Sequence, residues 1–153
     1  MRTELRIGAI DTMTAKTDST DNLEIGLLLY PGAQRAAVLG LADLFSVANQ
    51  VAAELGANEL PQIRVSHWQA DEAGQLRLTE ASRRCAIQNV RVLIIPPSLA
   101  STPSSALLER HRGALCVWHG QGTVLASVCI GVFFIAASGL LDGRSASTHW
   151  NYC

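Results

Sequence analysis

The stretch from Val124 to Gly139, VLASVCIGVFFIAASG, decides how this chain is interpreted. With its flanks it forms an uncharged run from Gly120 to Leu141 that has Cys129 near its centre. The run is long enough for a membrane span, because about 20 apolar residues cross a bilayer. However, small and polar residues interrupt it, and its flanks carry neither a Lys/Arg cluster nor an aromatic belt. We therefore expect no membrane span here, and the remaining question is whether Cys129 is a core residue or a reactive one.

The pattern inside this run divides it into two elements. Thr123 to Val128 is β-branched and apolar, which predicts a strand, and Gly131 to Ser138 predicts a buried helix. Cys129 then falls on the turn between them. A tight turn at a nucleophile needs small residues two positions away on either side, and Ser127 and Gly131 meet that need. S-V-C-I-G thus has the form of a nucleophile elbow, with serine in place of the first glycine.

Such a position would change the chemistry of the sulfur. The free amides and the dipole at the start of a helix favour a thiolate, and the backbone amide of Ile130 is a candidate oxyanion donor. His149 is a candidate base, because Asp142-Gly143 turns the chain back after the helix. On spacing alone, a small buried Cys129 and a packing or surface His149 remain open as alternative interpretations.

Composition limits the other functions. A chain of 153 residues makes one domain, and a net charge of -1 gives no basic face for direct nucleic-acid binding. The four cysteines show no C-x-x-C pair and no metal-ligand spacing with histidine, so we expect a reducing cytoplasm and neither a metal nor a cofactor. The polar residues 1–22 are predicted to be a disordered lead-in to a domain over residues 23–153.

The rest of the pattern predicts an α/β sandwich with a mostly parallel sheet, since short apolar runs alternate with helical periodicity. We expect strands at Leu23–Tyr30, Ile63–Gln69 and Val90–Ile95, a small extra strand at Leu76–Thr79, and helices at Ala36–Leu55 and Ser104–His119.

These stretches also carry a resemblance. SVCIGVFFIAASGLLDGRSASTHW, preceded by LEIGLLLYPGAQ, GLADLFSVAN and VLIIPPSLA, resembles the DJ-1/PfpI family. More narrowly, it is similar to the amino-terminal domain of AraC-type transcription regulators of the glutamine-amidotransferase-like class. The resemblance implies a flavodoxin-like three-layer sandwich, a homodimer and a small-molecule ligand, with Cys129 as the elbow cysteine and His149 as its partner. Cys129, His149 and Ser98 are then the expected ligand contacts.

The chain departs from the family pattern at several positions. Ala37 stands where enzymes of the family often carry an acid, and Ile130 stands where the isonitrile hydratase branch has threonine. Pro96-Pro97-Ser98 replaces a P-G-G turn, so Ser98 supplies the second candidate oxyanion amide, because Pro97 has no N–H. Family members also continue beyond the T-H-W segment, which predicts a domain that is C-terminally incomplete, by natural truncation or as part of a longer protein.

The leading functional hypothesis is the ligand-sensing or dimerisation domain of an AraC-type regulator, without its helix-turn-helix part. The alternative is a cysteine-dependent hydrolase or hydratase of the DJ-1/PfpI type that uses Cys129 and His149. A redox- or aldehyde-responsive sensor is a third hypothesis, which needs a reactive thiol but no turnover.

Overall fold

The computed structural model describes residues 22–57, 59–81, 89–99, 102–148 and 150–152. Of the predicted lead-in over residues 1–22, residue 22 alone is among the described residues. Cys85, His149 and Cys153 also lie outside them. In chain order the elements are β1 (Leu23–Leu29), α1 (Arg35–Glu54), β2 (Ile63–Ala70), β3 (Leu76–Ala81), β4 (Val92–Ile95), α2 (Ser105–Gly120), β5 (Val124–Ser127), the 3-10 turn η1 (Cys129–Gly131), α3 (Val132–Ala137) and the 3-10 turn η2 (Trp150–Tyr152).

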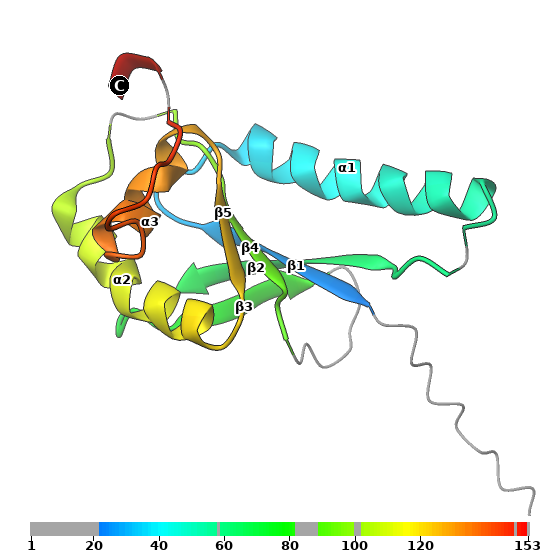
Figure 1. The fold of residues 1–153 in the computed structure, drawn as a ribbon, viewed down its shortest axis with the longest axis horizontal. Helices are drawn as coiled ribbons and strands as arrows, with labels where there is room; N and C mark the ends of the chain where they lie inside the picture. The colour runs from blue at the N-terminus through cyan, green and yellow to red at the C-terminus, as the bar shows by residue number, and fades with distance from the viewer. Residues whose placement is uncertain (1–21, 58, 82–88, 100–101, 149, 153) are drawn as a thin grey trace, which may run out of the picture.

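The strands form one sheet in the order β3-β2-β1-β4-β5. β1 pairs in parallel with β2 and β4, and β4 pairs in parallel with β5, whereas β3 runs antiparallel to β2. Helix α1 covers one face of the sheet and α2 and α3 cover the other (Figure 1). The predicted α/β sandwich with a mostly parallel sheet is confirmed, and it is consistent with a flavodoxin-like fold.

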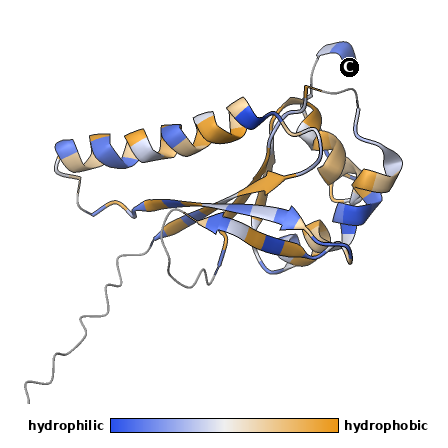
Figure 2. Ribbon diagram, turned by 180° about the vertical axis from the view of Figure 1, so that it is seen from behind, coloured by the Kyte–Doolittle hydropathy of each residue, from blue (hydrophilic) through white to orange (hydrophobic). Residues whose placement is uncertain are grey.

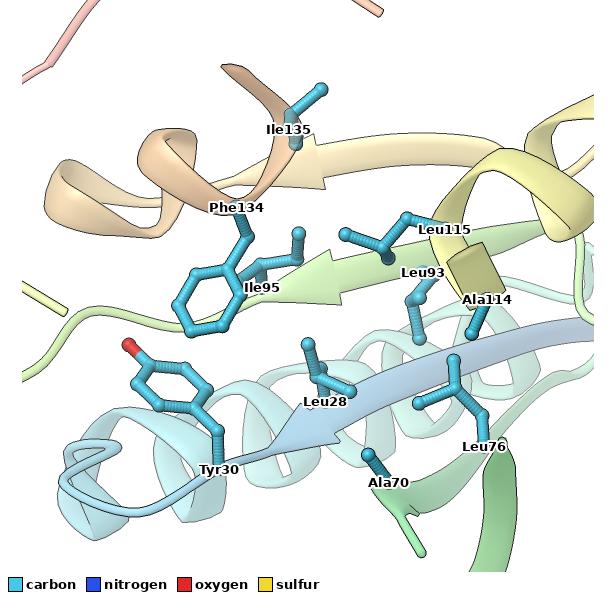
Figure 3. Packing of buried hydrophobic residues seen from close by; sticks show 10 residues of the cluster. All are labelled: Leu28, Tyr30, Ala70, Leu76, Leu93, Ile95, Ala114, Leu115, Phe134 and Ile135. Atoms are coloured by element: carbon cyan, nitrogen blue, oxygen red, sulfur yellow. The ribbon is translucent and has the colours of Figure 1, made fainter. Parts of the chain in front are cut away.

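The central strand is apolar on both faces because each face has its own core. Leu28 and Tyr30 belong to the larger cluster under α2 and α3, and Leu27 belongs to the smaller cluster under α1. In the larger cluster the rings of Tyr30 and Phe134 lie 4.6 Å apart between their centroids (Figure 3). The ring of His111 meets that of Phe134 edge to face. Burial lowers the pKa of His111, so its neutral ring packs as a core residue.

Helix α1 differs from the prediction in how much of it is covered. Its apolar positions were expected to face the core, yet Val38 alone among them is buried. Four apolar side chains stay between 46% and 78% exposed and follow one another along the helix: Leu44, Val47, Val51 and Leu55. Leu41 and Phe45 pack on the sheet, so α1 carries two apolar sides and the described sheet covers one of them. Figure 2 shows hydrophobic and hydrophilic residues alternating along α1.

Two segments bear on membrane association. The uncharged run from Gly120 to Leu141 is divided between the end of α2, β5, η1 and α3, so it forms no single spanning helix. Helix α1 is long and apolar enough to cross a bilayer by length and composition, a test that core helices of soluble proteins also pass.

Candidate functional site

The site is built around a turn in which Cys129 adopts a left-handed backbone conformation. Cys129 has a φ of 56°, and among the described residues it is the single non-glycine residue with positive φ. This conformation costs a side-chain-bearing residue about 1–2 kcal/mol. Its thiol is free and half-buried. The helical segment was expected to begin at Gly131. In the structure a 3-10 turn, η1, already begins at Cys129, and a 3-10 turn is wound more tightly than an α-helix.

Close backbone packing explains why this turn needs a small residue at position 131. A methyl group on Gly131 would lie 2.5 Å from the Ile95 carbonyl oxygen and 3.0 Å from that of Pro96. The Ile95 oxygen also accepts a hydrogen bond of 3.0 Å from the Val128 amide, which holds the end of β5 against β4. The sequence-based expectation that the backbone is crowded two residues after Cys129 agrees with this geometry.

The loop after β4 is bonded to the loop between β1 and α1. The backbone N–H of Gln34 donates to the Pro97 carbonyl at 2.8 Å, and Ser98 forms an isolated antiparallel bridge with Ala33. Ile130 is buried through its side chain, at 3% exposure. The two candidate oxyanion residues are therefore held in fixed backbone, Ser98 by this bridge and Ile130 within η1.

The segment that carries the candidate base returns to the turn. Thr148 donates its hydroxyl to the Cys129 carbonyl at 3.3 Å, which places the residue before His149 beside the turn at Cys129. His149 itself lies outside the described residues, so its pairing with Cys129 stays a prediction. The first turn of α1 holds no acidic residue, in keeping with Ala37 at that position. Within the described part of the chain no three His, Cys, Asp or Glu side chains gather as a metal site.

Tyr30 is a site residue that the sequence pattern predicts only as the end of a strand. Its hydroxyl donates to the Pro96 carbonyl at 2.7 Å across the loop that faces Gly131. Burial, with a further contribution from the negative charge of a nearby Cys129 thiolate, raises the pKa of Tyr30 to about 12. Tyr30 therefore remains a protonated donor at neutral pH. An aromatic residue directly before Pro31-Gly32 at a strand end was the available signal.

No family model matches the chain. It is 29% identical over 133 residues to an uncharacterized protein encoded in the cpoL 5′ region of Streptomyces lividans, covering 82% of this chain and 86% of that protein. It is 28% identical over 130 residues to isonitrile hydratase from Pseudomonas putida, covering 85% of this chain and 54% of the hydratase. The fold matches the crystal structure of a candidate transcriptional regulator from Vibrio parahaemolyticus with a TM-score of 0.55 and 16% identity, over 86% of this chain and 69% of that one.

The similarity to the hydratase and the shared fold support a DJ-1/PfpI-like domain. The match to the regulator is a match of fold alone at that identity, and the domain spans about half the length of the hydratase.

The described residues give this DJ-1/PfpI-like domain a limited chemistry at the turn. A cysteine sulfur there can be alkylated, oxidised or attacked by an electrophilic ligand. Tyr30 donates its proton to a backbone carbonyl, and a carboxylate is missing from the first turn of α1. Acyl transfer or hydration needs a positioned acid or base as well as a nucleophile, and His149 is the sequence-based candidate for that role.

Proposed function

We propose that this DJ-1/PfpI-like domain is the ligand-sensing and dimerisation part of an AraC-type transcription regulator whose helix-turn-helix part this chain does not contain. The observation that carries the proposal is the site itself. The strained conformation of Cys129 is retained, while the acid position at the start of α1 is occupied by Ala37. A turn that keeps its geometry without its acidic partner suits ligand binding better than turnover.

The expected ligand is a small molecule that contacts Cys129, Ser98 and His149 in a cytoplasmic protein. The candidate regulator with a similar fold supports this assignment, as does the net charge of -1, which leaves DNA binding to another part of the regulator. We expect no cofactor at this site.

The second apolar side of α1 supports homodimer formation. Monomeric proteins rarely leave a contiguous apolar patch open to water, and Leu44, Val47, Val51 and Leu55 form such a stripe along the helix. Analytical ultracentrifugation of the chain tests this part of the proposal. We expect a dimer mass for the wild type and a monomer mass for Val47→Glu/Val51→Glu. The exposed Val117→Glu on α2 is a matched control and should leave the dimer intact.

A DNA-binding assay tests the regulatory part. We expect the chain alone to show no sequence-specific affinity for DNA upstream of its own gene. Tight operator binding by this chain would refute the proposal that another part of the regulator binds DNA. A small molecule that protects Cys129 from alkylation would support the sensing role.

The competing function is a cysteine-dependent hydrolase or hydratase, which the left-handed Cys129 favours. Turnover of isonitrile or ester substrates that is lost in both Cys129→Ser and His149→Gln would establish it and displace the regulator proposal. Alkylation of Cys129 without any turnover would instead support a sensor.

A further inference from the structure

A second candidate site lies on the other side of the sheet, between α1 and the strands β2 and β3. A cleft of about 480 Å³ runs from the loop after β1 along the first turn of α1, and its walls include Leu29, Pro31, Arg35, Val38, Leu39 and His67. A second cleft of about 340 Å³ adjoins it further along α1, and the two share Leu39, His67 and Glu80. Cys129 lines neither cleft, although Tyr30, whose hydroxyl donates to the Pro96 carbonyl near Cys129, lines the larger one.

His67 is the group at the junction of the two clefts. Its side chain is 13% exposed, and its Nδ1 lies 3.3 Å from the Glu80 carboxylate on β3. The other ring nitrogen, Nε2, is buried and has no hydrogen-bond partner among the described residues. The register of the β2–β3 pair shifts between His67 and Trp68, and such bulges often re-aim a side chain beside a binding site.

The tautomer of the neutral ring follows from its partner. A carboxylate can only accept, so Nδ1 carries the proton that faces Glu80, and Nε2 presents a lone pair. A buried acceptor without a donor costs free energy, which a bound hydroxyl or N–H group would recover. A ligand that offers a hydrogen-bond donor to Nε2 of His67 would therefore be favoured.

The end of the larger cleft at Arg35 is suited to bind an anion. Arg35 begins α1, forms no ion pair among the described residues, and stands in a first turn without acidic residues. The amides of that turn and the helix dipole add positive potential at the same end. Between this end and His67 the walls include the apolar residues Leu29, Val38 and Leu39 and the polar residue Gln69.

We propose that this cleft binds a small organic acid whose apolar body carries one hydrogen-bond donor. Its carboxylate pairs with Arg35 at the start of α1, its body packs on the apolar walls, and its hydroxyl or N–H group donates to Nε2 of His67. A volume of about 480 Å³ is within the range of small-molecule sites. The proposal is independent of any role for Cys129.

Binding requires one local movement. Nε2 is closed to water in this structure, so a ligand must displace a side chain to reach it. Leu39 lines both clefts beside His67 and is 61% exposed, and an exposed leucine changes rotamer readily.

Isothermal titration of the full chain with three matched compounds tests the proposal. 4-Hydroxyphenylacetate carries all three features, phenylacetate lacks the donor, and 4-hydroxyphenylethanol lacks the anion. We expect saturable binding of the first, with affinity lower by about 5-fold or more for each of the other two. In the protein, Arg35→Gln should remove the preference for the acid over the alcohol, and His67→Phe should remove the preference for the hydroxylated acid.

The controls separate this site from the elbow and from general charge effects. Arg112→Gln removes a cation from α2 on the opposite face of the sheet and should leave all three affinities unchanged. Cys129→Ala should also bind 4-hydroxyphenylacetate like the wild type. The proposal is overturned if the three compounds bind alike or not at all, if Arg35→Gln has no effect, or if Cys129→Ala abolishes binding. If His67→Phe does not fold, the ligand series on the wild type and Arg35→Gln still decides the question.

Discussion

Replacing Gly131 by alanine should destabilise the protein, although Gly131 has an ordinary helical φ of -56°. The added methyl group would meet the Ile95 carbonyl oxygen at 2.5 Å, the Pro96 carbonyl oxygen at 3.0 Å and the Ile95 carbonyl carbon at 3.2 Å. All three atoms belong to backbone, so no flexible side chain can move aside. The backbone of η1 or of β4 must shift instead.

The magnitude follows from the size of that shift. Real Cβ atoms essentially never approach another heavy atom closer than 3.0 Å, so the contact at 2.5 Å requires a movement of at least the 0.5 Å difference. Ile95 is fully buried, and its oxygen is held by the Val128 amide. Overpacking of this kind costs about 1–3 kcal/mol, and the preference of alanine over glycine in a helix returns at most about 1 kcal/mol. The expected net loss is about 1–2 kcal/mol.

Urea denaturation followed by circular dichroism measures this difference. Gly113→Ala is the matched control, because Gly113 lies in α2 and its added methyl group would meet nothing within 4 Å. That variant should gain about 0.5–1 kcal/mol. The reasoning is refuted if Gly131→Ala is as stable as the wild type, or if both alanine variants shift the midpoint in the same direction.

Other measurements test the hydrogen bonds and backbone around the two sites. Tyr30→Phe leaves the buried Pro96 carbonyl without its donor and should cost about 1–3 kcal/mol in the same urea assay. Because the folded pKa of Tyr30 is raised to about 12, its contribution is complete below pH 10 and is lost as the pH rises to 12; wild-type stability should fall over that window more steeply than that of Tyr30→Phe. Cys129→Gly should be about 1 kcal/mol more stable than Cys129→Ala, since glycine accepts positive φ freely; equal stabilities would argue against the strained turn. Asn49→Ala removes two hydrogen bonds to the backbone of Ile63 and should cost about 1–3 kcal/mol, seen as a lower urea midpoint.

Elements fixed by local signals could be predicted from the sequence. The continuous apolar run of β1 ends at Pro31-Gly32, and the structure ends the strand at Leu29. Ser104 was expected to begin a helix, and its side chain caps α2 by accepting from the Leu107 amide. The turn at Cys129 was also predictable, because Ser127 and Gly131 flank it and the apolar pattern changes there from that of a strand to that of a helix.

Features that depend on distant segments could not be predicted in this way. Helix α1 has apolar residues on two sides, and periodicity alone cannot say which side the sheet will cover. No pattern in the sequence singles out His67, because its partner Glu80 follows 13 positions later and meets it only through the β2–β3 register. The proximity of Tyr30 to the turn at Cys129 likewise depends on the order of β1, β4 and β5 in the sheet.

The loop between β1 and α1 connects the two candidate sites physically. Its residues Pro31 and Ala33 line the cleft on the α1 side, while Gln34 and Ala33 are bonded to Pro97 and Ser98. The chain at the end of β4, which leads into Pro97 and Ser98, carries the Ile95 and Pro96 carbonyl groups against which Gly131 packs. A ligand that moves the first turn of α1 must therefore strain or break contacts that hold the elbow in place, since packed backbone transmits small displacements. Measuring the alkylation rate of Cys129 with and without 4-hydroxyphenylacetate follows this connection directly: a changed rate in the wild type that is absent in Arg35→Gln demonstrates the coupling, and an unchanged rate at saturating ligand shows that the two sites act separately.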